Sequence, residues 1–155
     1  MPSAVTAAYQ NRRFLESAVQ FMTACAGVRQ FIDIGCGLPA PGAVHEVALG
    51  IAPGARVACV DRDPAVIAEL SASLAGYPTV RAVRGDLRRP GGILSHPALV
   101  SFIDTTEPVA VILTAVLHFV ADDGHAEIAG VLRRPGDHAA GDCQRRHLAS
   151  RICGR

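Results

Sequence analysis

The sequence predicts an α/β protein in which about four parallel strands are flanked by helices, a doubly wound fold with an incomplete sheet. Three observations lead to this class. Short apolar runs alternate with segments of helical periodicity, several of these runs are apolar on both faces, and the first ends in a glycine-rich turn. Such strands are typical of a parallel sheet that helices cover on both sides. With 155 residues, the chain is long enough for one domain with a sizeable core.

The N-terminal part of the chain is expected to form a helix, a strand and a second helix. The first helix is predicted over residues 11–26, with Asn11 as its cap. Its buried face is expected to consist of Phe14, Ala18, Met22 and Cys25. A strand at 30–34 then leads through the glycine turn into a helix over about 43–50.

The same strand–helix order continues along the chain. Asp63 is expected to cap a helix whose first position is Pro64, a residue favoured there because its fixed φ suits a helix start. Prolines and glycines interrupt residues 87–104, so short helical turns are the most that this segment should form. The other elements are expected as a strand at 56–60, a helix from 63 to about 75, strands at 79–83 and 109–115, and a helix at 122–132.

Composition and charge exclude several classes of function. A net charge of +1 gives no field that would collect nucleic acid over the whole surface. The longest apolar stretch, residues 108–121, is shorter than a bilayer span, and the N-terminus lacks the order of a secretory signal, so a cytoplasmic location is expected. The five cysteines show no Cys-x-x-Cys pair, which predicts neither a disulfide framework nor a metal site.

The C-terminal segment differs from the rest of the chain. We expect a domain over residues 1–132 and an irregular basic tail over 133–155, where neither strand alternation nor a core face is evident. The strand at 109–115 would then lack a neighbour on one side. Because an uncovered edge strand can pair with another chain, we expect self-association through it.

The turn after the first strand raises the question of its ligand. Residues 35–40 (GCGLPA) follow the pattern G-x-G-x-x-[GA] of dinucleotide-binding turns, with Asp61 as the later acidic residue, so an NAD-binding oxidoreductase fragment is one hypothesis. Pro39 and Pro41 remove backbone donors from the turn, however, and Asp33 would place a negative charge beside a pyrophosphate. A cationic ligand such as S-adenosylmethionine meets neither objection. The structural alternative is a plain tight turn with a satisfied carboxylate.

Several motifs in a fixed order narrow this choice. They are NRRFL, DIGCGLPAPGAVHEVA, VDRDP, GDL and VLHFV. In this combination residues 11–132 resemble the class I S-adenosylmethionine-dependent methyltransferases, and more narrowly a bacterial family whose substrates are largely unassigned. The resemblance implies a Rossmann-like fold, S-adenosylmethionine as cofactor and a small-molecule or unknown methyl acceptor. The family pattern continues beyond the fourth helix, so a truncated chain is expected, and an inactive cofactor-binding remnant is an alternative.

The resemblance also implies a set of site residues. Asp33 and the two glycines of the turn would hold the methionine end, Asp61 would accept hydrogen bonds from the ribose, and Asp86 with its apolar neighbour would meet the adenine. His118 is the candidate catalytic residue, because an imidazole can orient the cofactor or accept a proton from the methyl acceptor. The implied cofactor-binding residues are Arg12, Asp33, Gly35, Cys36, Gly37, Asp61, Arg62, Asp86, Leu87, Thr114 and Ala115.

Each of these roles has a structural alternative. Asp61 could be a helix cap, although Asp63 already fills that position, and Asp86 could merely close a turn. Arg12 could be only solvated. His118 could pack its ring beneath the site at the start of a helix. The acceptor itself is not legible in the sequence.

Overall fold

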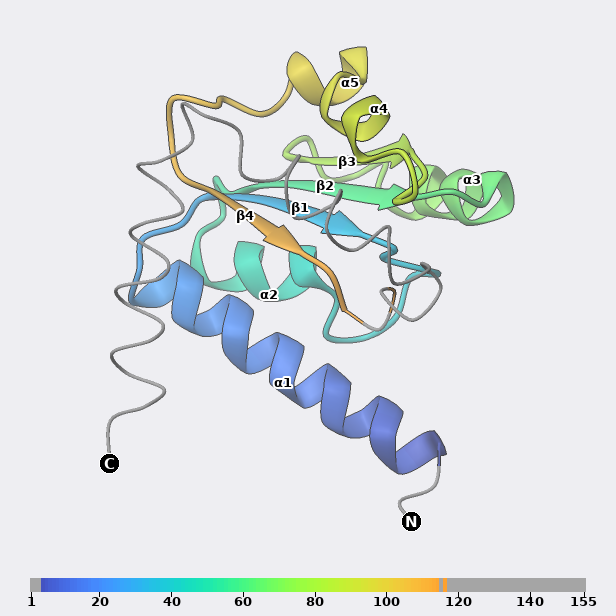
Figure 1. The fold of residues 1–155 in the computed structure, drawn as a ribbon. Coiled ribbons are helices and arrows are strands. Elements are labelled where there is room, and N and C mark those ends of the chain that lie inside the picture. Colours follow the sequence, from blue (N-terminus) through green and yellow to red (C-terminus); the bar gives the residue numbers. More distant parts are fainter. Residues whose placement is uncertain (1–3, 115, 117–155) are drawn as a thin grey trace.

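The computed structural model describes residues 4–114 and 116 as a parallel sheet between two layers of helices (Figure 1). The sheet order is β3-β2-β1-β4, and every neighbouring pair is parallel. This arrangement confirms the predicted fold class. The strands are β1 (Gln30–Ile34), β2 (Arg56–Asp61), β3 (Val80–Arg84) and β4 (Val109–Ile112).

Helices cover both faces of the sheet, as continuous apolar strands require. On one face lie α1 (Ala4–Ala24), α2 (Val44–Ile51) and α3 (Pro64–Ser73), which bury side chains against Phe31 and Val57. On the other face lie α4 (Pro90–Leu94) and α5 (Pro97–Val100), which form a second core with Ile32, Ile34 and Val60. Residues 87–104 therefore form two short helices, as expected from their prolines.

The first helix differs from its prediction in start and in buried face. It begins at Ala4, because residues 4–10 contain no helix breaker and extend the same periodicity toward the N-terminus. Asn11 is therefore an internal residue of α1 and not its cap. Phe14 is 71% exposed, and the buried face instead consists of Leu15, Val19 and Thr23, with Met22 packed beside them. The Thr23 hydroxyl is satisfied because it donates to the Val19 carbonyl at 2.7 Å.

The order of the strands creates a switch point at the carboxyl end of β1. The chain leaves β1 toward β2 on one side, and it returns later to place β4 on the other side. Open α/β sheets bind ligands at such a point, because the connections on the two sides diverge there. Asp33 lies at this end of β1, in register with Cys59 of β2 and Ile112 of β4.

Some sequence predictions fall on residues whose structure is not described. These are the helix at 122–132, the tail at 133–155, Ala115 and His118. Strand β4 ends at Ile112, earlier than the predicted residue 115. Among the described residues β3 and β4 are the edge strands of the sheet. Self-association through β4 stays a prediction, which light scattering of the purified chain would check.

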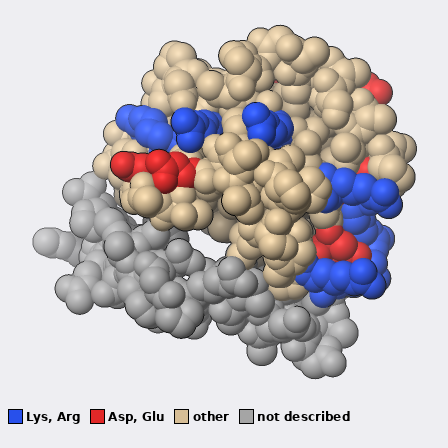
Figure 2. Space-filling model, turned by 90° about the horizontal axis from the view of Figure 1, so that it is seen from above, with Lys and Arg blue, Asp and Glu red and all other residues tan. Residues whose placement is uncertain are grey.

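The surface gives two further observations. No helix in the described part of the chain is both long and apolar enough for a membrane span. Arginines on the face shown in Figure 2 lie in separate groups, with acidic side chains beside some of them and uncharged surface in between. Among the described residues this face therefore presents no continuous basic stripe.

Candidate cofactor site

A cavity of about 880 Å³ lies at the carboxyl ends of the strands. This volume is within the range of sites that hold cofactors and other small molecules. Every predicted site residue that the structure describes lines it, whereas Ala115 and His118 lie outside the described residues. The predicted residues lining the cavity are Arg12, Asp33, Gly35, Cys36, Gly37, Asp61, Arg62, Asp86, Leu87 and Thr114.

The glycine turn keeps bare backbone at the cavity. Gly35 and Gly37 have φ values of +78° and +69°, a conformation that side chains disfavour. A Cβ at Gly35 would also overlap the side chain of Val116, whereas a Cβ at Gly37 would meet nothing within 4 Å. Gly35 is thus required for conformation and for packing. Gly37 leaves open space in which a ligand can approach the main chain.

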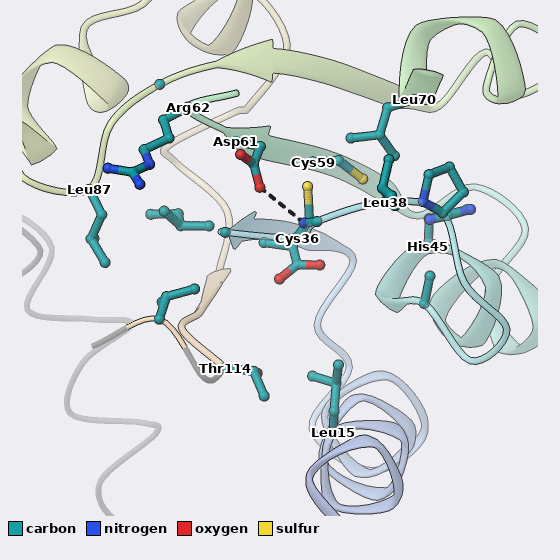
Figure 3. Close-up of a pocket in the computed structure, with 18 of the residues that line it drawn as sticks. Leu15, Cys36, Leu38, His45, Cys59, Asp61, Arg62, Leu70, Leu87 and Thr114 are labelled. Atoms are coloured by element: carbon teal, nitrogen blue, oxygen red, sulfur yellow. Dashed lines mark hydrogen bonds between the residues drawn. The ribbon is translucent and has the colours of Figure 1, made fainter. Parts of the chain in front are cut away.

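The backbone donors of this turn are already used inside the protein. The N–H groups of Gly35 and Cys36 donate to the Val60 carbonyl at 2.8 and 3.2 Å. The N–H of Gly37 donates to Asp61 Oδ2 at 3.1 Å, the contact drawn in Figure 3. Residues 35–37 therefore offer no free N–H to an anion.

Asp61 links the ends of β1 and β2. Besides the Gly37 contact, its Oδ1 accepts from the N–H of Asp63 at 3.0 Å. Asp63 in turn caps α3 by accepting from Ala65 N at 2.8 Å, which confirms the predicted cap. A carboxylate has about four acceptor positions, so Asp61 keeps capacity for about two more donors. It holds the turn and still presents acceptors to the cavity.

Asp33 is a buried acid at the centre of the site. Its side chain is 8% exposed, and among the described residues no donor forms a hydrogen bond with it. Burial first, and then the nearby Cys59 thiol, raise the pKa of Asp33 to about 7, while the charges of Arg12 and His45 act in the opposite direction. The nearby Asp61 raises it further. A positive ligand group would favour the ionised form, which burial disfavours, and would be attracted to it.

Arg12 and Glu46 hold the loop that follows the glycine turn. The guanidinium of Arg12 donates to the carbonyl of Gly42 at 3.4 Å, and Glu46 Oε2 accepts from the N–H of the same residue at 2.8 Å. Glu46 thus binds back to Gly42, the residue before the cap of α2, in a variation of the capping box. This gives the Glu of the VHEVA motif a structural role that the sequence alone did not supply.

Two thiols and an imidazole form a cluster in the cavity that sequence reasoning missed. The side chains of Cys36 and His45 both lie close enough to Cys59 to change its pKa. The interaction with Cys36 first, and also that with His45, lower the pKa of Cys59, while the same thiol contact raises the pKa of Cys36 and Cys59 raises the pKa of His45. The His45 ring also meets Tyr77 edge-on, with centroids 5.8 Å apart.

Asp86 follows β3 and is already paired. Its carboxylate accepts from Arg88 Nε at 3.0 and 3.1 Å, from Arg88 Nη2 and from the Arg88 N–H at 3.0 Å. These contacts form the tight turn that was the structural alternative for this residue. Arg88 also lines the cavity; it completes the DLR motif of the family pattern, but no site role was predicted for it.

The fold and the residues of the cavity together define a class of protein. An open parallel sheet with a glycine turn at its switch point and an acidic residue at the end of β2 is typical of Rossmann-like proteins that bind nucleoside-containing cofactors. The model of the S-adenosyl methyltransferase family matches residues 1–142, and the chain belongs to this family. The membership confirms the resemblance seen in the motifs, and the family's cofactor is an S-adenosyl compound.

Solved structures agree with this assignment. A candidate methyltransferase from Thermobifida fusca YX is 32% identical, with a TM-score of 0.82 over 94% of this chain and 62% of that chain. A DUF574 family protein from Streptomyces avermitilis MA-4680 is 40% identical, with a TM-score of 0.70 over 80% of this chain and 47% of that chain. The match thus spans less than two thirds of either structure. No curated protein matches the sequence.

Proposed function

We propose that the cavity binds S-adenosylmethionine and that the chain carries the cofactor-binding part of a methyltransferase. One observation carries this proposal. The glycine turn has its N–H groups occupied, while Asp33 lies buried beside it without a donor among the described residues. At the turn, the described residues therefore offer carboxylate acceptors and no free backbone N–H from residues 35–37, which suits a ligand with an ammonium group and hydroxyls.

The methionine end of the cofactor would lie at Asp33 and Gly37. Asp33 would accept from the ammonium group, which supplies the hydrogen-bond donor that no described residue gives this buried carboxylate. The open space over Gly37 admits the ligand to within contact of the main chain. Arg12 lines the same cavity and would face the carboxylate of the methionine group.

The ribose and adenine would lie along the ends of β2 and β3. Asp61 would use its remaining lone pairs to accept from the two ribose hydroxyls. Leu87 gives an apolar contact for the purine. Asp86 can accept from the purine amino group only in competition with Arg88, which already occupies its oxygens.

The chemistry asks mainly for alignment. When bound, S-adenosylmethionine supplies an electrophilic methyl group on a sulfonium sulfur. The residues of this chain would bind and orient that group for an incoming acceptor, and alignment alone accounts for a large part of such a rate enhancement. The methyl acceptor, and a role of His118 in deprotonating it, are not assigned by the described residues.

An NAD-binding oxidoreductase fragment is the weaker reading of the same turn. A pyrophosphate needs free N–H groups and no adjacent negative charge. Here those groups are bonded to Val60 and Asp61, and Asp33 lies beside them. The polar groups of the turn are therefore arranged for the opposite charge.

Calorimetric titration separates these readings. The chain is titrated with S-adenosylhomocysteine, which has the same amino-acid and adenosine groups as S-adenosylmethionine, and in parallel with NAD. Binding of the first and not of the second is expected. Binding of NAD alone would overturn the proposal. Binding of S-adenosylhomocysteine without methyl transfer to any acceptor would instead support the cofactor-binding remnant.

We also propose a cytoplasmic location for the chain. The support is the presence of free thiols at Cys25, Cys36 and Cys59. Reducing compartments keep such thiols unpaired. Fractionation of cells that express the chain, with detection in the cytosolic fraction, checks this location.

A further inference from the structure

Two cysteines meet in the floor of the cavity, although they are far apart in sequence. Cys36 belongs to the glycine turn, and its N–H donates to the carbonyl of Val60, the residue directly after Cys59. This bond brings the backbone of the turn against β2. Figure 3 shows the two sulfur atoms beside each other, in agreement with the effect of each thiol on the pKa of the other. Both residues are free thiols and both line the cavity.

The surroundings of the pair favour thiol chemistry. His45 lines the same cavity as Cys59, and a protonated imidazole near a thiol stabilises the thiolate, which is the nucleophilic form. The lowered pKa of Cys59 agrees with this geometry. Cys36 is partly exposed at the cavity, whereas Cys59 is only 2% exposed. A small oxidant can therefore reach the pair through the cavity, but bulky reagents cannot approach Cys59 from outside.

We propose that Cys36 and Cys59 form a dithiol site that small peroxides oxidise to a disulfide, and that this disulfide opposes cofactor binding in the same cavity. In the first step one thiolate attacks a peroxide oxygen, the O–O bond breaks, and a sulfenic acid and hydroxide form, the hydroxide taking a proton to give water. The second thiol then attacks the sulfenic sulfur, forming the S–S bond and releasing a second water. Two electrons and two protons pass from the thiols to one hydrogen peroxide.

The effect on the cofactor follows from the position of Cys36. A disulfide needs the two sulfur atoms about 2 Å apart, closer than a hydrogen-bonded pair of thiols. Closing the bond draws Cys36 toward β2 and with it the glycines on either side, which leave the position that faces the ligand. This part of the inference depends on the proposed function, whereas formation of the disulfide does not. By linkage, a bound cofactor should also shift the equilibrium between dithiol and disulfide toward the dithiol.

The test uses the full chain, reduced and then treated with hydrogen peroxide. Remaining thiols are alkylated, and peptide mapping by mass spectrometry locates the bond. We expect a linkage between Cys36 and Cys59, marked by the loss of two hydrogen atoms. Linkage to Cys25, Cys143 or Cys153 instead, or no linkage, would overturn the inference. In a second variant these three cysteines are serine, so that only the pair can react, and the same bond is expected.

The effect of the disulfide on cofactor binding is measured in a separate experiment. Oxidation should weaken binding of S-adenosylhomocysteine roughly tenfold or more, and dithiothreitol should restore it. In Cys59→Ser the ratio of affinities before and after peroxide should become one, while Cys25→Ser, which removes an exposed thiol, should keep the wild-type ratio. A disulfide that leaves the affinity unchanged would overturn the coupling. If the reduced chain binds no S-adenosylhomocysteine, the proposed function fails while the mass measurement still decides on the disulfide.

Discussion

Asp33 and Asp86 are carboxylates of one cavity, yet their pKa values move in opposite directions. Asp33 lies within β1, where burial raises its pKa to about 7. Asp86 follows β3, where hydrogen bonds from the Arg88 side chain lower its pKa to about 2. The two groups are chemically the same. What differs is how deeply each group is buried and whether a described residue donates a hydrogen bond to it.

This difference distinguishes Asp86, a carboxylate that stabilises the fold, from Asp33, a carboxylate that is available to bind a ligand. Asp86 has its partner in the chain and stabilises a turn. Asp33 has no donor among the described residues, and its burial costs free energy whenever the group is ionised. Such a cost is typical of a site whose ligand supplies the missing hydrogen-bond donor. Asp33 is therefore the acid in this cavity whose removal should matter most to binding.

Replacing Asp33 with Asn should have the largest effect, and in opposite directions on stability and binding. A pKa of about 7 against 3.8 in the unfolded chain means that the ionised form destabilises the fold, with an upper value on the order of 4 kcal/mol. The loss of stability begins as pH rises above 3.8 and is complete above about 7. D33N should thus raise the free energy of unfolding at pH 8 and change it little near pH 4. Urea unfolding at both pH values measures this.

The same substitution, D33N, should weaken cofactor binding although it stabilises the fold. Without the negative charge, affinity for S-adenosylhomocysteine should fall between about tenfold and a thousandfold, as expected when one partner of a buried charged pair is removed. Asp86→Asn is the matched control from the same cavity, and it should not raise stability at pH 8. A D33N variant that is more stable and still binds with wild-type affinity would contradict the assigned role of Asp33.

The pH dependence of binding should follow from the titration of Asp33. The groups that face it are Arg12, His45, Cys59 and Asp61. A bound ammonium favours the carboxylate, so the pKa should be lower in the complex than in the free protein, and binding should release protons below pH 7. Affinity should rise up to about tenfold per pH unit between pH 5.5 and 7, and fall above about 8 as the ligand amine loses its proton.

Calorimetry in buffers of different ionisation enthalpy measures the protons released. In D33N the rise in affinity between about pH 5.5 and 7 should disappear, whereas the fall above about pH 8, which is due to the ligand amine, should remain. A rise of unchanged slope in D33N would mean that one of the neighbouring groups titrates instead of Asp33.

The sequence was sufficient for the fold class and for most of the cavity, because both depend on local patterns. Apolar runs that alternate with helical segments predict a parallel sheet, and the acids that end such runs meet at one edge of it. The start and buried face of α1 were wrong for a physical reason. The helix carries two adjacent apolar stripes, one with Phe14 and one with Leu15 and Val19, and only packing against the sheet selects the second.

The thiol cluster could not be predicted, because it depends on strand register. In the sequence Cys59 belongs to an apolar run, where cysteine is usually a small core residue. Its neighbour Cys36 is identified only by the contact between β2 and the turn after β1. His45 reaches the same place from the opening turn of α2. Knowledge of the pairing between β1 and β2 would have brought these three residues together.

Asp61→Ala should have a smaller and more mixed effect than D33N. The change leaves the N–H groups of Gly37 and Asp63 without their acceptor, which should cost about 1–3 kcal/mol of stability, and it removes the acceptors for the ribose. Asp63→Ala is the control, because it removes only the cap of α3, costs about 1 kcal/mol, and should leave affinity unchanged. Equal loss of affinity in both variants would indicate that Asp61 acts through folding alone. Thermal unfolding and calorimetry are measured on the same samples.

Arg88→Ala should have the smallest effect and decides the role of Asp86. The guanidinium is exposed, so no measurable change in thermal stability is expected, while the pKa of Asp86 should rise from about 2 toward its ordinary value. If Asp86 accepts from the adenine amino group, freeing its oxygens should strengthen binding of S-adenosylhomocysteine by less than about fivefold, because the group is partly solvated. A loss of affinity would mean that Arg88 itself contacts the ligand. Asp86 would then be a residue that positions Arg88, and the adenine contact would belong to the guanidinium.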